Sequence, residues 1–479
     1  MCKILKKHLK IGKMELSRNQ RINLRCFIML DFEISKKLNI KADEIDLDKS
    51  YYSFNPNTCY LTIELYLKKD VDIICPICGT REIHVRGSKL SIIKTSFVDS
   101  NNVIVNVHRR IYKCCNNHSF IQNNPLSPEG RKISIQKDIL ILNALKDKTK
   151  TYSSIAKEFD VSTTYVIDLF DRRVDARRLS LPTVLCIDEV HAKKLVKNSY
   201  CCVLYAPQWR KIVDVLDSRH KLDLIDYFSK ISIEEKNKVQ FISMDLWESY
   251  RDVAKLCFPK AKICADPFHV VKNLVMCFQD IRIGIMKKYE HLKREGSNYY
   301  WLFKKFWKFL IKDISKLPDG PIRVSKSGMF MSKYQIIECM LSLDPKLRKA
   351  YDLKEEYRNF VATSNISVAN DELNILISKF KEAHIPEYAT FIKLLNNWHD
   401  EIVNSFNMIN GHKITNGPME RVNRDIKTIF GISFGSSNFP RMRNRIIYCI
   451  NQDVSILAWR KKETNKKVGK PRGKYKTKK

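Results

Sequence analysis

The chain has 479 residues, and its 86 lysines and arginines against 52 aspartates and glutamates give a formal net charge of +34. This length predicts several domains, and the positive excess favours a polyanionic partner, nucleic acid first of all. No uninterrupted apolar run reaches the roughly 18 to 20 residues of a membrane-spanning helix. The 15 cysteines are scattered through a chain without a recognisable secretory signal, so we expect a soluble, cytoplasmic protein without a disulfide framework.

The segment 1–60 is predicted to be a basic N-terminal segment. Its first 24 residues have no clear pattern, and we assign them no role. The next segment, 61–124, is predicted to be a zinc-binding ribbon, because a C-x-x-C pair is followed downstream by a second group of cysteines and a histidine. The candidate zinc ligands are Cys75, Cys78, Cys114, Cys115 and His118. Either Cys114 or Cys115 can be the third ligand. The alternative is a set of reduced, buried thiols.

Strand patterns lie between the two halves of this zinc motif. Leu90–Ser96 and Val103–Val107 alternate apolar and polar residues, and the turn-forming residues Asp99–Asn102 separate them. A hairpin of this kind would bring the second cysteine group back toward the first. We therefore expect a small ribbon of strands around one ion.

The segment 125–180 has the spacing of a helix-turn-helix. Ser153 can cap a first helix, Asp160–Ser162 makes a turn, and Thr163–Arg173 forms a second helix. The start of that helix would face base edges, and its end would meet phosphate. The candidate DNA contacts are Thr163, Thr164, Tyr165, Arg172 and Arg173. An ordinary helical hairpin or a protein-binding module is the alternative.

From Pro182 the pattern alternates between strands and helices. The expected strands are Thr183–Val190, Tyr200–Tyr205, Lys211–Leu216, Val239–Met244 and Lys262–Ala265. A helix from about Leu222 to Ile231 precedes the fourth strand, and a helix from Glu248 to Cys257 follows it. Three strands, a helix, a strand, a helix and a strand are the order of a ribonuclease H-like α/β sheet.

Three carboxylates in separate motifs carry the predicted chemistry. Asp188 and Asp245 each follow an apolar strand segment, where an unpaired charge would be costly, and in such a sheet they would lie side by side. Glu420 is the third candidate, on a helix that begins near Asn416-Gly417-Pro418. Carboxylates suit Mg²⁺ or Mn²⁺, and a pair of such ions drives in-line attack at phosphorus. The alternative for any one of them is a solvated surface charge. The possible substitutes are Glu189, Glu248, Asp252 and Asp266.

Long segments of the chain resemble the transposases of the insertion-sequence L-three (ISL-three) family. The resemblance is carried by CIDEVHAKK, SMDLWESYRDVAKLCFPKAKICADPFHVVKNL and TNGPMERVNRDIKTIFGISFGSSNFPRMRNRI. CPICG and RRIYKC look like that family's zinc finger, although here Cys114 and Cys115 are adjacent and His118 takes the last place. The resemblance implies a ribonuclease H-like DDE transposase that cleaves the inverted ends of its element and joins them to target DNA.

The resemblance also implies site residues. Asp188, Asp245 and Glu420 match the acidic triad of the family. Asp266 lies in another family motif, ADPFHVVKN, and competes with Asp245 for the second position. We favour Asp245, because it follows the fourth strand, and interpret Asp266 and His269 as a supporting cluster.

Spacing predicts an inserted domain. Asp245 and Glu420 are 175 residues apart (420 − 245), more than a compact ribonuclease H fold requires. Helical patterns fill the interval, so we expect an all-α insertion over 275–403 that divides the core into 181–274 and 404–455. The segment 456–479 is expected to be a disordered basic tail that binds DNA nonspecifically.

The predicted protein is therefore a multi-domain α/β transposase of bacterial type, associated with the nucleoid. Its partners would be double-stranded DNA, as terminal inverted repeats and as target, and a second copy of the chain on paired ends. Its cofactors would be Mg²⁺ or Mn²⁺ at the carboxylates and Zn²⁺ in the ribbon. The alternative from another class is a domesticated, catalytically inactive regulator that keeps the zinc finger and the helix-turn-helix.

Overall fold

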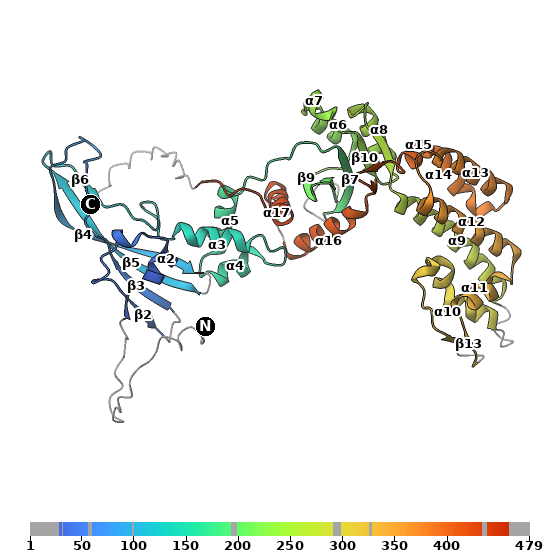
Figure 1. The fold of residues 1–479 in the computed structure, drawn as a ribbon, viewed down its shortest axis with the longest axis horizontal. Coiled ribbons are helices and arrows are strands. Elements are labelled where there is room, and N and C mark those ends of the chain that lie inside the picture. Colours follow the sequence, from blue (N-terminus) through green and yellow to red (C-terminus); the bar gives the residue numbers. More distant parts are fainter. Residues whose placement is uncertain are drawn as a thin grey trace, which may run out of the picture. The chain divides into compact units, whose positions relative to one another are not determined.

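The computed structural model describes residues 28–30, 32–55, 60–97, 100–192, 199–290, 298–324, 328–433 and 438–458. The chain divides into two compact units: the chain up to Asp175 with the segment from Gln452 onward, and Ala176–Asn451 (Figure 1). Among the described residues, no helix is both long and apolar enough to cross a membrane. Most of the basic tail predicted over 456–479 falls outside the described residues.

The first unit contains a six-stranded sheet in the order β1-β2-β3-β5-β4, with β6 paired to β5. Its strands are β1 (Ile28–Met29), β2 (Tyr51–Asn55), β3 (Tyr60–Tyr66), β4 (Ile83–Phe97), β5 (Ser100–Cys114) and β6 (Ser119–Ile121). The two strands predicted for the zinc ribbon lie within β4 and β5, which form one long antiparallel hairpin (Figure 1). β3 joins the other edge of β5 in parallel, so the sheet includes strands from before residue 60.

Alternation along the strands explains which face of this sheet is buried. Ile63 and Leu65 of β3 and Val103, Val105 and Val107 of β5 are all nearly inaccessible. Side chains two residues apart share one face of a strand, so these residues form one apolar layer. The short helix α2 (Phe32–Leu38) contributes Leu38 to this layer.

Three helices follow the sheet in the same unit, and each begins at a hydroxyl residue. They are α3 (Ile135–Ala144), α4 (Tyr152–Glu158) and α5 (Thr163–Arg173), capped by Ser134, Thr151 and Ser162. The predicted bounds of the last helix are confirmed. Ser153 was the wrong cap for the preceding helix, because the cap is Thr151, two residues earlier, which forms a reciprocal capping box with Ser154. Asp160, with φ at 48°, makes the turn between the two helices.

The second unit is built on a five-stranded sheet in the order β11-β10-β7-β8-β9. The strands are β7 (Val184–His191), β8 (Tyr200–Ala206), β9 (Lys211–Leu216), β10 (Phe241–Met244) and β11 (Lys262–Ala265). β7, β10 and β11 run parallel, whereas β8 and β9 continue the sheet antiparallel to their neighbours. All five strands predicted from the sequence are present. Their apolar runs are buried, as expected for a sheet covered on both faces.

Helices cover this sheet on two sides. α6 (Lys221–Ser229) and α8 (Glu248–Cys257) pack over the face that carries Leu185 and Ile187. α16 (Gly417–Ile432) packs against β7, and α17 (Phe439–Asn451) packs against β9. The side chains of β7 alternate between faces, so Asp188 lies on the face opposite to Ile187. The short helix α7 (Ile233–Lys236) precedes β10.

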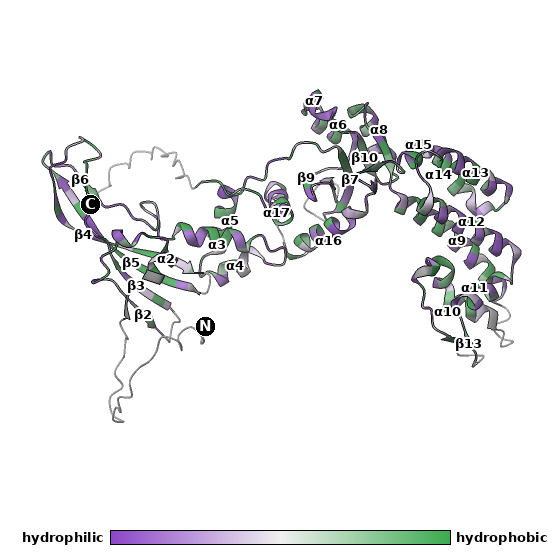
Figure 2. Cartoon of the chain, viewed as in Figure 1, coloured by the Kyte–Doolittle hydropathy of each residue, from purple (hydrophilic) through white to green (hydrophobic). Residues whose placement is uncertain are grey.

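A helical region lies between β11 and α16 along the chain (Figure 1). Its helices are α9 (Pro267–Lys288), α10 (Asn298–Ile311), α11 (Lys333–Leu341), α12 (Pro345–Thr363), α13 (Ala369–Glu382), α14 (Ala389–Asn397) and α15 (His399–Asn404). Figure 2 shows hydrophobic and hydrophilic residues mixed along α9 and α12, and the apolar ones form a common core. The predicted insertion is therefore largely helical.

Two details of that region differ from the prediction. α9 begins at Pro267, within the segment expected to belong to the core. A short hairpin of β12 (Ile322–Arg323) and β13 (Phe330–Met331) interrupts the helices, so the insertion is not all-α. A second hairpin, β14 (Met408–Ile409) and β15 (His412–Lys413), leads into α16. Short 3-10 helices occur at Ala42–Glu44, Ile314–Lys316 and Pro386–Tyr388.

Candidate functional site

Three aspartates lie at one level of neighbouring parallel strands in the second sheet, one within β7 and two directly after β10 and β11. The register places Met244 of β10 opposite Ile187 of β7 on one side and opposite Ala265 of β11 on the other. The next residue along each of these strands is an aspartate: Asp188, Asp245 and Asp266. Because side chains at one level of parallel strands point to the same face, the three carboxylates form a row on the face that α16 covers.

His269, in the first turn of α9, links two members of this row. Its Nδ1 lies 3.0 Å from Oδ1 of Asp245 and 3.0 Å from Oδ2 of Asp266. Hydrogen bonds to Asp245 and then to Asp266 raise the pKa of His269 to about 10. One ligand atom from each of these three residues lies within 4.8 Å of the other two, a spacing at which they could share a metal ion. These hydrogen bonds favour the protonated imidazole, which forms an ion triad with the two carboxylates.

Asp188 has a different environment. Burial, followed by the charge of Asp245, raises the pKa of Asp188 to about 7. Its Oδ1 accepts a hydrogen bond from the backbone N–H of Glu189 at 2.7 Å, and its Oδ2 accepts one from Nδ2 of Asn423 at 2.6 Å. The two carboxylates repel each other, so a cation bound beside them would favour the ionised form of both.

Glu420 is carried by the helix that closes this face. α16 begins at Gly417 with Pro418 in its first turn, as predicted. Asn416, Glu420 and Asn423 are spaced by four and three residues, which places them on one side of the helix. Asn416 contacts the strand ends at one end of this stripe, and Asn423 contacts Asp188 at the other. Glu420 lies between them along the helix.

The structure thus brings two members of the predicted triad together, whereas the third, Glu420, makes no hydrogen bond or ion pair with either of them. The register brings Asp188 and Asp245 to the same level of adjacent strands. Glu420 is exposed and makes no hydrogen bond or ion pair with any described residue. It does not belong to the group of closely spaced donors found among the described residues, and neither does Asp188.

Sequence reasoning missed the two asparagines that border Glu420. Asn416 is buried, and its Nδ2 donates to the carbonyl of Ile187 at 3.2 Å and lies 3.5 Å from Oδ1 of Asp245. The Oδ1 atoms of Asn416 and Asn423 are both buried without a hydrogen-bond partner among the described residues. Their spacing from Glu420 was the available signal, since residues three or four apart share a helix face.

The donor set suits a hard divalent cation. Carboxylate and amide oxygens are the ligands that Mg²⁺ and Mn²⁺ prefer. The raised pKa of Asp188 reports negative charge gathered in a buried place, which a cation would relieve. The amide oxygens of Asn416 and Asn423, which lack a hydrogen-bond partner among the described residues, are further oxygen ligands available to a cation. The residues therefore fit such an ion.

A second donor cluster lies in the first unit, where β4 begins and β5 ends. Its members are Cys75, Cys78, Cys114 and His118. The Sγ atoms of Cys78 and Cys114 are 3.8 Å apart, and Nδ1 of His118 lies 3.5 Å from Sγ of Cys114 and 3.9 Å from Sγ of Cys75. Tetrahedral zinc, with Zn–S near 2.3 Å and Zn–N near 2.0 Å, requires donor-to-donor distances of roughly 3.5 to 3.8 Å.

Two tight turns present these donors. The backbone N–H of Gly79 donates to the carbonyl of Cys75, and Gly79 has a φ of 72°, which a residue without Cβ adopts easily. On the other side, the backbone N–H of Cys114 donates to the carbonyl of His118. The backbone N–H of Thr80 lowers the pKa of the Cys78 thiol to about 6. Cys115 is exposed and outside the cluster, with its Sγ 3.6 Å from the hydroxyl of Thr80.

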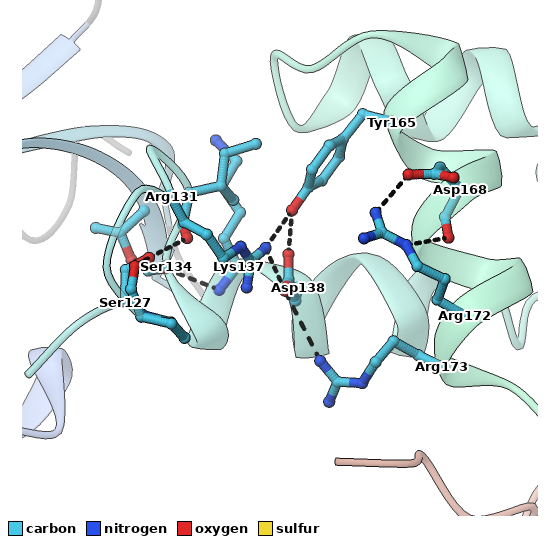
Figure 3. A network of polar contacts seen from close by, with 12 residues as sticks. Ser127, Arg131, Ser134, Lys137, Asp138, Tyr165, Asp168, Arg172 and Arg173 are labelled. Carbon is cyan, nitrogen blue, oxygen red and sulfur yellow. Dashed lines mark hydrogen bonds and ion pairs between the residues drawn. The ribbon is translucent and has the colours of Figure 1, made fainter. Parts of the chain in front are cut away.

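The predicted DNA contacts of α5 fall into two groups. Thr163 and Thr164 are exposed at its N-terminus, and Arg172 is exposed near its end, paired with Asp168 one turn earlier. Tyr165 and Arg173 belong to an internal network instead, shown in Figure 3.

In this network, Asp138 of α3 is completely buried. Its carboxylate accepts from the hydroxyl of Tyr165 and from Arg131, whose side chain also donates to the Tyr165 oxygen at 2.7 Å. Arg173 lies 3.8 Å from the same carboxylate and is 6% exposed. Both predicted contact residues are therefore engaged in holding α3 and α5 together.

A family model described as a transposase, of the DDE type found in ISL-three insertion sequences, matches residues 185–446. The matched segment is more than half of the chain and includes the carboxylate row and α16. The protein is thus a transposase by class, which implies an enzyme that cleaves or transfers DNA, with DNA as its partner. The chain belongs to the ISL-three family of DDE transposases. No curated protein matches the sequence.

Proposed function

We propose that the second unit is a ribonuclease H-like catalytic core that cleaves DNA at the ends of an insertion sequence and joins them to a target. Asp188, Asp245 and Glu420 are its catalytic carboxylates. The observation that carries this proposal is the register: Asp188 within β7 and Asp245 directly after β10 lie at one level of adjacent parallel strands, and α16 lays the side that bears Glu420 over them. The sheet order, with the first strand between the fourth and the second, agrees with this type of core.

Each residue has a distinct task in the proposed chemistry. Asp188 and Asp245 supply negative charge at one place on the sheet, and Asn423 and the Glu189 backbone fix the direction of the Asp188 carboxylate. His269 neutralises Asp245 through an ion pair that it shares with Asp266. Two divalent cations bound there would supply activation of the attacking hydroxyl and stabilisation of the leaving oxygen.

The reaction consists of two transfers at phosphorus. In the first, a water oxygen attacks the phosphate at the element's end, and the 3′-oxygen leaves as a hydroxyl. In the second, that 3′-hydroxyl attacks a phosphate of the target, whose own 3′-oxygen leaves. No covalent enzyme intermediate is involved, which agrees with the hydrogen bonds and ion pairs of the carboxylate row: among the described residues, none of them is made with a serine, cysteine or tyrosine.

We further propose that the first unit binds the terminal inverted repeats. Cys75, Cys78, Cys114 and His118 would hold a structural zinc ion, and α4 and α5 would act as a helix-turn-helix. Thr163 and Thr164 are the residues offered to base edges, and Arg172 is offered to phosphate. Tyr165 and Arg173 are left out of this surface, because their side chains are used between α3 and α5. Two chains would act together on paired ends.

The deciding experiment is a cleavage and strand-transfer assay on DNA that carries the element's ends. Asp188→Asn, Asp245→Asn and Glu420→Gln are each expected to lower the rate at least 1,000-fold in Mg²⁺, a loss typical of removing one essential catalytic group. Asp252→Asn, an exposed carboxylate on α8 paired with Lys221, is the matched control and should retain full rate. Equal rates in all four variants and the parent would instead favour a DNA-binding regulator without catalysis.

A further inference from the structure

Asp266 is the most deeply buried carboxylate of the row, with 2% of its surface exposed. Its Oδ1 accepts hydrogen bonds from the hydroxyl of Thr415 at 3.0 Å and from the backbone N–H of Asn416 at 3.1 Å. Its Oδ2 accepts from Nδ1 of His269 at 3.0 Å. A carboxylate has about four acceptor positions, so protein donors already use most of those of Asp266.

The two bonds to Oδ1 connect parts of the chain that are 149 and 150 residues apart. The chain leaves the sheet at β11, passes through the whole helical region and returns at Thr415, next to the strand end that it left. Asn416 extends the connection to β7, because its Nδ2 donates to the carbonyl of Ile187 at 3.2 Å. The start of α16 is thereby tied to the end of β11 and to the middle of β7.

Glu420 follows this attachment by a single helical turn. Helix geometry places its Cα about 6 Å along the axis from that of Asn416 and on a similar side of the helix. Any shift of the Thr415–Asn416 segment must therefore move Glu420 by a comparable distance relative to Asp188 and Asp245. A loop attached only by its own backbone would not hold the carboxylate to the tolerance that a metal site requires.

We propose that Asp266 is a positioning residue, which fixes Thr415 and Asn416 and so sets Glu420 over Asp188 and Asp245, and that it does not itself bind a catalytic cation. This inference rests on the proposed function of the same site. It separates the two aspartates that the family motifs leave in competition: Asp245 faces the cation, and Asp266 faces the helix that carries the third carboxylate.

The test measures Mn²⁺ binding to the full chain without DNA, with free Mn²⁺ counted by electron paramagnetic resonance. Glu420→Gln gives the reference loss of affinity. Asp266→Ala removes the attachment and should lower the affinity as much as Glu420→Gln, about tenfold or more. The double variant should bind no worse than Glu420→Gln alone, because Asp266 acts through Glu420 and the two effects do not add.

Asp266→Asn distinguishes a ligand from a positioning residue. Asparagine keeps one oxygen that can accept from Thr415 and Asn416 but lacks the charge that a cation would need. We expect its Mn²⁺ affinity to stay within about threefold of the parent, well short of a lost ligand or supporting bond. A loss as large as that of Asp188→Asn would make Asp266 a ligand and overturn the proposal.

A second pair of variants covers the case in which Asp266→Ala does not fold. Thr415→Val removes only the hydroxyl that bonds Asp266, and Thr415→Ser keeps it. The valine variant should lose Mn²⁺ affinity while the serine variant retains it, with equal melting temperatures for both without metal. Equal Mn²⁺ affinities in the two variants would overturn the proposal.

The outcome for Glu420→Gln separates the two levels of inference. If this variant binds Mn²⁺ as the parent does, the proposed function loses its third carboxylate, and the positioning role falls with it. If Glu420→Gln loses affinity but the double variant of Asp266→Ala and Glu420→Gln loses much more, only the positioning role is overturned and the catalytic assignment stands.

Discussion

Asn423 of α16 donates its side-chain amide to Oδ2 of Asp188 of β7 at 2.6 Å, a contact between residues 235 apart in the chain. The other oxygen of Asp188 accepts the backbone N–H of Glu189. Both oxygens of the carboxylate are therefore oriented before any cation arrives. Supporting bonds of this kind commonly determine how well a metal site binds.

Removing the Asn423 amide should weaken metal binding without unfolding the chain. We expect Asn423→Ala to lower Mn²⁺ affinity about tenfold, because the Asp188 carboxylate is then free to rotate. Asn396→Ala is the matched control, since the Asn396 amide donates only to a carbonyl of its own helix. Mn²⁺ titration of both variants, with melting temperatures taken in chelator, checks the prediction. Equal affinities would show that α16 does not orient Asp188.

The pKa of Asp188 predicts how the stability of the metal-free protein depends on pH. Burial and the charge of Asp245 raise the pKa of this carboxyl to about 7 in the folded chain, from about 3.9 in an unfolded one. Between these values the folded chain holds a proton that the unfolded chain has released. The stability contributed by the group is therefore fully present below about pH 4 and is lost as the pH rises through 7.

Asp188→Asn imitates the protonated carboxyl and should remove this dependence. In chelator, the variant is expected to melt above the parent, by a margin that grows between pH 5 and pH 8. Excess Mn²⁺ should reverse the order at pH 8, because only the parent gains a ligand that stabilises the fold. If the difference in melting temperature between the variant and the parent is the same at pH 5 and pH 8, the pKa of Asp188 lies near its ordinary value and the prediction is wrong.

Local patterns were enough to predict most elements of this fold. Thr163–Arg173, Lys211–Leu216 and Glu248–Cys257 agree with the structure to the residue, because their periodicity and their flanking polar residues mark both ends. The wrong cap at Ser153 shows the limit of such signals. Ser153, Ser154 and Thr151 are chemically similar, and only the backbone geometry selects one of them.

The candidate site depended on contacts that no local pattern contains. Asn423 and Asp188 are polar residues in distant motifs, and nothing in either motif states that they meet. Tyr165 illustrates the same limit in the other direction. Its place near the start of a recognition-type helix suggested contact with a base, but its hydroxyl bonds a carboxylate buried on α3.

The two adjacent cysteines of the first unit allow a direct test of the zinc proposal. Cys114 lies among the donors, whereas Cys115 is exposed beyond them. Cys115→Ser should therefore retain about one zinc ion per chain, and Cys114→Ser should lose it. Zinc content after dialysis measures this, and chelator should lower the melting temperature of the parent and of Cys115→Ser only. Zinc loss in Cys115→Ser with retention in Cys114→Ser would exchange the two assignments.

The network around Asp138 predicts a stability effect at a residue first expected to contact DNA. Tyr165→Phe removes the hydroxyl that bridges Asp138 and Arg131, and should lower the free energy of unfolding by about 1 to 3 kcal/mol. Thr164→Ala, at an exposed position of the same helix turn, should change it by less than about 0.5 kcal/mol. Urea unfolding of the two variants checks the difference. A larger effect at Thr164 than at Tyr165 would contradict the network's role.

When DNA binding is measured instead of stability, we expect the opposite order on α5: Thr164→Ala should have a larger effect than Tyr165→Phe. Thr164→Ala is expected to weaken binding to the terminal repeat by about 1 to 3 kcal/mol while leaving nonspecific binding unchanged, because a hydroxyl that reads a base edge contributes only at the correct sequence.

Arg172→Ala should weaken binding to both the terminal repeat and nonspecific DNA and reduce the slope of log affinity against log salt by about 1, as expected for one phosphate contact. Lys238→Ala, an exposed lysine of the other unit, is the control for simple loss of positive charge. If Lys238→Ala changes the salt dependence as much as Arg172→Ala does, the effect comes from the loss of net charge. The proposal that Arg172 of α5 contacts phosphate would then be wrong.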